Sequence, residues 1–173
     1  GSGFYLDFGS DDMNTYISIL GNVNCTGGLS LSDNSGGDLK VRGNMTFSTG
    51  YTFSPKTRAV FFTKNGTQVI SSSSLTTTFH YVVFEPVSGS TTIQLSGTDL
   101  DITAPSTGNA ISFSSASDVF DLNGRTLRIG TASTNNSISG GGTFKGSITS
   151  NITLYGNGTV GTLNFTTGFQ VLG

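Results

Sequence analysis

Residues 81–129 read YVVFEPVSGSTTIQLSGTDLDITAPSTGNAISFSSASDVFDLNGRTLRI, a series of short apolar and polar alternations broken by Gly, Ser, Thr, Asn and Pro. Period two is the spacing of side chains along one face of a β-strand. No window of this stretch keeps apolar residues at helical spacing, so the sequence predicts strands and no helix. Apolar residues stand two positions apart in five segments: Ile93–Leu95, Leu100–Ile102, Ile111–Phe113, Phe120–Leu122 and Leu127–Ile129.

Short strands at nearly regular spacing fit either a β-sandwich or barrel, or a solenoid. A sandwich favours longer strands, hairpin turns and often a core Trp, and the chain has no Trp. Apolar alternations recur about every 20 residues, which lies in the range of one coil of a parallel β-solenoid. We therefore predict an all-β fold, a right-handed parallel β-helix of about eight coils of roughly 20 residues, whose stacked coils bury a continuous axial core.

Composition restricts the possible partners of the chain. Only 10% of its 173 residues are charged, against roughly 25% in an average globular protein. Ser, Thr, Asn and Gly must therefore cover most of the surface, as is typical of secreted and cell-surface repeat proteins. The eight Lys and Arg residues are scattered, so we expect no nucleic-acid partner. No apolar run approaches the roughly 18 residues that cross a bilayer, and we expect no membrane insertion.

Both ends of the sequence look cut. Gly1-Ser2-Gly3 resembles a cloning scar, and the chain stops inside the apolar alternation of residues 169–173. We therefore expect residues 4–173 to form a single β-solenoid domain excised from a longer protein. Its partners would include neighbouring repeats of the same polypeptide.

Three segments carry a family resemblance. Residues 61–71, FFTKNGTQVIS, followed by residues 77–83, TTFHYVV, resemble a recurring unit of very large secreted proteins of Bacteroidota. Residues 118–130, DVFDLNGRTLRIG, look like the LDLNGYTLTIG segment of those proteins, and residues 156–165, GNGTVGTLNF, are similar to another of their phrases. The resemblance implies a parallel β-helix in a cell-surface or released adhesin-like protein exported by the type IX system. Gliding adhesins and polysaccharide-degrading enzymes both carry such repeats, so it does not choose between them.

Four aspartates form the strongest candidate site. Asp99 and Asp101 share the strand face opposite the apolar residues between and after them. A coil of about 20 residues would place Asp121 beside Asp101, and Asp118 near Asp99. Because stacked carboxylates repel, this arrangement predicts a cation between them, and Ca²⁺ takes six to eight oxygen ligands.

Two other interpretations of these aspartates stay open. They also fit a solvated row of corner residues that binds nothing. They fit, thirdly, the outward Asp clusters with which some β-helical pectinolytic enzymes work, where Arg125 or Arg128 would supply the positive charge.

The single Cys and the single His have simpler interpretations. Cys25 alternates with Val23, which predicts a buried small apolar residue and excludes an internal disulfide or a site of several cysteines. His80 follows Phe79 at a strand junction without a recognisable nucleophile motif, so we expect a corner or solvent-facing role.

Together these features predict a non-enzymatic repeat segment of a secreted bacterial cell-surface adhesin. It would display polar β-helix faces for attachment to a surface or an extracellular polysaccharide, as in cell adhesion or gliding motility. Two alternatives remain: a carbohydrate-binding module, or a fragment of a β-helical polysaccharide lyase or hydrolase. No cofactor is expected apart from possible Ca²⁺.

Overall fold

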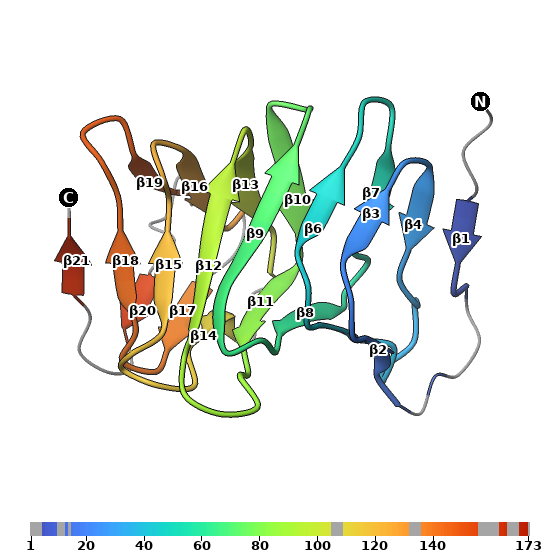
Figure 1. Cartoon of the computed structure of the whole chain (residues 1–173), viewed down its shortest axis with the longest axis horizontal. Coiled ribbons are helices and arrows are strands. Elements are labelled where there is room, and N and C mark those ends of the chain that lie inside the picture. The colour runs from blue at the N-terminus through green and yellow to red at the C-terminus, as the bar shows by residue number, and fades with distance from the viewer. Residues whose placement is uncertain are drawn as a thin grey trace.

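A computed structural model describes residues 5–9, 13, 15–104, 109–131, 136–155, 163–165 and 170–172. The described residues form 21 strands and no helix. Gly1-Ser2-Gly3 and residues 156–162 of the third resembling segment lie outside them. All strand pairs that the structure describes are parallel, and each pair joins a strand to the third strand after it along the chain. The predicted all-β parallel solenoid is confirmed (Figure 1).

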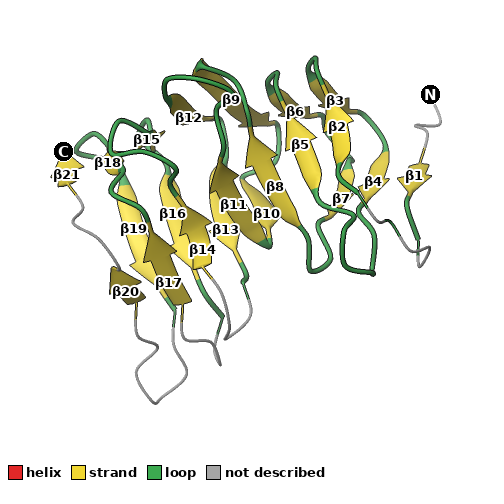
Figure 2. Ribbon diagram, turned by 90° about the horizontal axis from the view of Figure 1, so that it is seen from below, coloured by secondary structure: helices red, strands yellow, loops and turns green. Residues whose placement is uncertain are grey.

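Each turn contributes one strand to each of three faces, which run along the long axis of the molecule (Figures 1 and 2). Face I contains β2 (Ile17–Ile19), β5 (Leu39–Val41), β8 (Ala59–Phe62), β11 (Tyr81–Phe84), β14 (Asn109–Ser112), β17 (Asn136–Ser139) and β20 (Leu163–Phe165). Face II contains β3 (Val23–Cys25), β6 (Met45–Phe47), β9 (Gly66–Ser72), β12 (Thr91–Ser96), β15 (Val119–Asp121), β18 (Thr143–Lys145) and β21 (Gln170–Leu172).

Face III is divided into two hydrogen-bonded sheets. The first contains β1 (Tyr5–Asp7), β4 (Gly28–Ser30) and β7 (Thr52–Ser54). The second contains β10 (Thr76–Phe79), β13 (Asp99–Ile102), β16 (Thr126–Ile129) and β19 (Asn151–Leu154). The five strands expected within residues 81–129 correspond to β12, β13, β14, β15 and β16.

The predicted coil of roughly 20 residues is too short. Asn22 meets Asn44 of the next turn after 22 residues, and Asp101 meets Arg128 after 27. Corner loops add the extra residues: β11 ends at Phe84 and β12 begins only at Thr91. The chain therefore makes about six turns in place of the eight predicted. The right-handed winding stays a prediction.

Strand alternation buries one side of every face along the axis. In β11, Val82 and Phe84 are buried, whereas Tyr81 and Val83 are only partly covered. Removing such side chains from water is the main favourable contribution to folding. Successive turns also stack aromatic rings, because Phe84 lies with its ring centroid 4.5 Å from that of Phe113. Cys25 is buried among the core residues, as predicted.

At the corner before face II, side-chain amides form hydrogen bonds with backbone N–H and carbonyl groups of other turns. Asn22 Oδ1 accepts the Asn44 N–H at 2.9 Å, and Asn44 Oδ1 accepts the Val69 N–H at 2.9 Å. The buried Gln68 amide donates to the carbonyl oxygens of Val41 and Gly43. These contacts replace water for backbone groups that turn away from the strands.

Candidate functional site

Asp99 and Asp101 lie on the outward side of β13, as the alternation predicts. Arg128 of β16 bridges them: Nη2 lies 2.8 Å from Asp99 Oδ2, and Nη1 lies 3.1 Å from Asp101 Oδ1. Asp99 Oδ1 also accepts the Thr126 N–H at 3.0 Å. The two carboxylates raise the pKa of Arg128 through these hydrogen bonds. Arg128 is thus the cation between them.

The predicted stacking of Asp121 on Asp101 is wrong. Asp101 pairs with Arg128 on face III, whereas Asp121 pairs with Gln94 and Lys145 on face II. The error follows from the coil length, since the partner of Asp101 is 27 residues away and not about 20.

Asp118 is fully buried at the entry to β15 and stands beside Thr91 of face II, whereas Asp99 stands beside Thr126 of face III, so the predicted stacking of Asp118 near Asp99 is also wrong. Asp118 Oδ1 accepts the Thr91 N–H of the preceding turn at 2.8 Å. Its Oδ2 accepts the N–H groups of Ser114 and Ser115 and the Ser114 hydroxyl, each at 2.9 Å. The carboxylate therefore joins two turns and holds the corner before β15.

Asp121 forms a second, smaller network at the end of β15. Its Oδ1 accepts the Asn123 N–H at 3.0 Å, and its Oδ2 accepts from Gln94 Nε2 at 3.1 Å. Lys145 of the following turn lies 3.3 Å from the same oxygen. Like Asp118, this carboxylate connects turns.

The four aspartates do not form one group, so the predicted Ca²⁺ site and the catalytic cluster lose the geometry on which they rested. Among the described residues, no three His, Cys, Asp or Glu side chains are arranged to hold a metal ion. The protein already supplies a counter-charge or a set of N–H and O–H donors to each carboxylate.

His80 lies at the corner between β10 and β11 and is half-buried. Its ring packs edge to face on Tyr81, and Nδ1 is 3.5 Å from the Thr103 hydroxyl. Burial lowers the pKa of His80, and the nearby Arg58 guanidinium lowers it further. The corner position that the sequence predicts is observed.

Face I carries a groove that the sequence analysis missed. It measures about 330 Å³ and is lined by Ser18, Ile19, Leu20, Lys40, Arg42, Thr63, Glu85, Pro86 and Val87. Lys40 Nζ lies 2.6 Å from Glu85 Oε2 and 3.9 Å above the centre of the Tyr16 ring. The alternation Leu39-Lys40-Val41-Arg42 signals two outward cations, but only the parallel register shows which side chains of other turns stand beside them.

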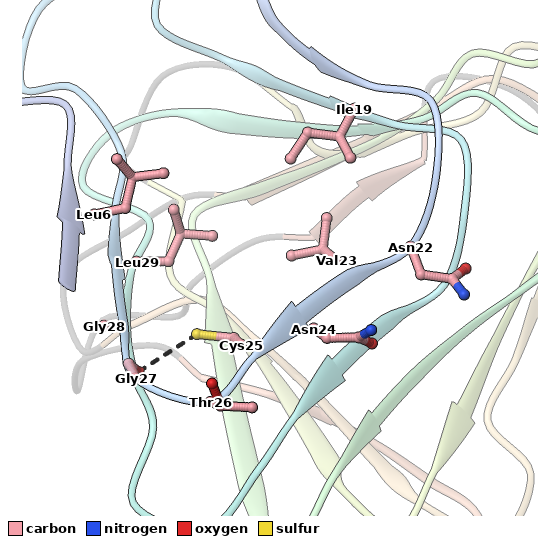
Figure 3. A pocket seen from close by; sticks show the side chains of 10 residues that line it. All are labelled: Leu6, Ile19, Asn22, Val23, Asn24, Cys25, Thr26, Gly27, Gly28 and Leu29. Atoms are coloured by element: carbon pink, nitrogen blue, oxygen red, sulfur yellow. Dashed lines mark hydrogen bonds between the residues drawn. The ribbon is translucent and has the colours of Figure 1, made fainter. Parts of the chain in front are cut away.

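A second pocket of about 320 Å³ opens at the N-terminal end of the core (Figure 3). Leu6, Ile19, Val23 and Leu29 line it, and Cys25 Sγ contacts the Gly27 carbonyl oxygen at 3.5 Å. Burial raises the pKa of the Cys25 thiol, which behaves as a small apolar side chain here.

Comparison with known proteins gives no match to a family model, a curated protein or a solved structure. In the part of the chain that the structure describes, no helix is long and apolar enough to span a membrane.

Proposed function

We propose that this chain is a structural section of a bacterial cell-surface adhesin, a right-handed β-helical stalk that displays polar faces to a surface or an extracellular polysaccharide. The observation that carries the proposal is the regular three-strand turn, repeated about six times with parallel register. A stack of this kind lengthens without redesign, because each turn contacts only its neighbours.

The surface chemistry supports the same function. Outward positions along one row of face III hold Thr78, Asp101, Arg128 and Thr153 in register. The charges in this row satisfy one another, and hydroxyls flank them. Few charges and many hydroxyls give a surface that can make many weak hydrogen bonds to glycan hydroxyls. Such contacts gain strength by repetition along an array.

The resemblance to adhesin-like Bacteroidota proteins adds to the proposal where the protein is located and how it is exported. Type IX export and display at the cell surface would bring these faces to a matrix or a neighbouring cell. Immunolabelling of intact and of lysed cells of the source bacterium tests this part: surface exposure requires equal labelling of both.

A carbohydrate-binding module is a second candidate, favoured by the face I groove. The two functions differ in valency: a stalk adheres through its whole length, whereas a module binds through one groove. Beads coated with the protein and pressed on immobilised polysaccharides give the test. We expect a rupture force that depends on polysaccharide coating. Forces equal to those on bare surfaces for every polysaccharide would contradict adhesion.

A further inference from the structure

The face I groove combines an available guanidinium with apolar walls. Lys40 is already held by Glu85 at 2.6 Å and by the Tyr16 ring. Arg42, in contrast, is exposed, and no carboxylate among the described residues lies within ion-pair distance of it. The Arg42 guanidinium is therefore the positive charge in the groove that a ligand can neutralise.

The walls of the groove favour a ring with an apolar face. Leu20 and Val87 are 78% and 74% exposed, and both line this one groove. Pro86 lies between Glu85 and Val87 in the same lining, and the hydroxyl-bearing Ser18 and Thr63 complete it. Covering the two aliphatic side chains would be favourable for any ligand that fits between them.

The elements that build the groove are fixed by the fold. The backbone N–H of Arg42 donates to the Ile19 carbonyl oxygen at 2.9 Å, and the backbone N–H of Val87 donates to the Thr63 carbonyl oxygen at 3.2 Å. The groove thus spans β2, β5 and the segments that follow β8 and β11. The strands β2, β5, β8 and β11 lie side by side on face I (Figure 2). A site on a rigid sheet needs little reorganisation to bind.

We infer that this groove binds a carboxylated sugar unit, a uronic acid residue of an acidic polysaccharide. The planar guanidinium of Arg42 matches a carboxylate with two parallel hydrogen bonds. Leu20 and Val87 contact the C–H face of the pyranose ring, while Ser18, Thr63 and Glu85 exchange hydrogen bonds with its hydroxyls. A bare phosphate or other small anion would leave the apolar walls uncovered. The inference deepens the proposed function, since it names the glycan class that the stalk would attach to.

The test is calorimetric titration with a short oligogalacturonate and with its fully methyl-esterified form. We expect the ester to bind at least about tenfold more weakly, because it loses the charge-assisted hydrogen bonds. Arg42→Gln should lower uronate affinity by about the same factor and abolish the preference over the ester. Arg42→Lys should bind with intermediate affinity, since the charge remains but the paired donors do not.

Two control variants separate the groove from general charge and from folding. Arg125→Gln changes another arginine, at the corner after β15, and should bind both probes like the wild type. Val87→Ser should lower the affinity for both probes to the same extent, because it alters the apolar wall and leaves Arg42, the partner of the carboxylate, unchanged. Circular dichroism of each variant confirms the fold.

Equal affinity of the wild type for both probes, no uronate binding at all, or an Arg42→Gln variant as strong as the wild type would each overturn the inference. If bead adhesion persists in any of these cases, the proposed adhesive function stands although the uronate-binding inference fails. Uronate binding through Arg42 without bead adhesion would overturn the stalk and leave the groove assignment standing.

Discussion

Two pairs of aspartates that look alike in sequence have different surroundings in the fold. Asp99 and Asp101 stand on the outside of face III, partly exposed, and share one arginine. Asp118 and Asp121 are buried at the two ends of β15, where backbone N–H groups and neighbouring polar side chains surround them. The outer pair is balanced by charge, and the inner pair mainly by hydrogen-bond donors.

The difference indicates what each pair contributes. A partly exposed ion pair gains little in water, typically below about 1 kcal/mol. A buried carboxylate with several donors is costly to disturb, because its removal leaves those donors without partners. The inner pair should therefore hold the turns together, while the outer pair chiefly keeps face III evenly charged.

The largest effect is expected for Asp118. Asp118→Ala leaves the N–H groups of Thr91, Ser114 and Ser115 without an acceptor and should lower the free energy of unfolding by about 3–5 kcal/mol. Urea titration followed by circular dichroism measures it. Asp118→Asn, which keeps the size but offers one acceptor oxygen, should lose less. A change below about 1 kcal/mol for the alanine variant would remove the contrast between the pairs.

Asp121 should come next. Asp121→Ala should cost about 1–3 kcal/mol, because the Asn123 N–H and the Gln94 amide lose their acceptor. Its ion-pair partner gives a matched comparison, since the Lys145 side chain is 58% exposed. Lys145→Ala should change stability by no more than about 0.5 kcal/mol. Similar losses in the two variants would mean that charge, and not donor satisfaction, stabilises this corner.

A smaller effect is expected for the outer pair. A double-mutant cycle of Arg128→Gln with Asp101→Asn should give a coupling of about 0.5–1 kcal/mol, because both side chains remain partly in water. The coupling should fall in 1 M salt, where screening shortens to about 3 Å. A salt-insensitive coupling as large as the loss in Asp118→Ala would contradict the assignment.

The smallest effect concerns pH. Since the folded pKa of His80 is lowered from 6.5, the unfolded chain takes up the proton first as the pH falls. The contribution of neutral His80 to the free energy of unfolding is thus fully present above pH 6.5, and it is lost as the pH drops toward the folded pKa. In the His80→Gln variant, the urea midpoint should change less between about pH 8 and pH 5.5 than it does in the wild type. An unchanged slope would mean that His80 is not the group that titrates.

Much of the fold could be predicted from the sequence because period-two alternation reports directly which side chains face the core. Val82 and Phe84, or Leu100 and Ile102, point inward as expected. The number of turns could not be predicted in the same way. Counting alternations does not show how many strands make one turn, and loops such as residues 85–90 lengthen a turn without changing any strand.

The candidate site depended on register, which the sequence leaves open. In the structure Asp101 pairs with Arg128, which forms a salt bridge. An error of a few residues in the length of a turn places Asp121 there instead and so predicts two carboxylates that repel. Cys25 and His80 were predictable because their environments depend on local alternation. The groove around Arg42 was not, since its lining comes from four turns.

The parallel register of successive turns is the central claim, and disulfide trapping tests it most directly. Ser112 and Ser139 are direct partners with their hydroxyl oxygens 3.2 Å apart, whereas Ser137 is the partner of Asn109. In a Cys25→Ser background, S112C/S139C should oxidise readily, because paired strands bring Cα atoms within disulfide range. The offset pair S112C/S137C should stay reduced under the same conditions. Cross-linking of the offset pair, or of neither pair, would contradict the solenoid described here.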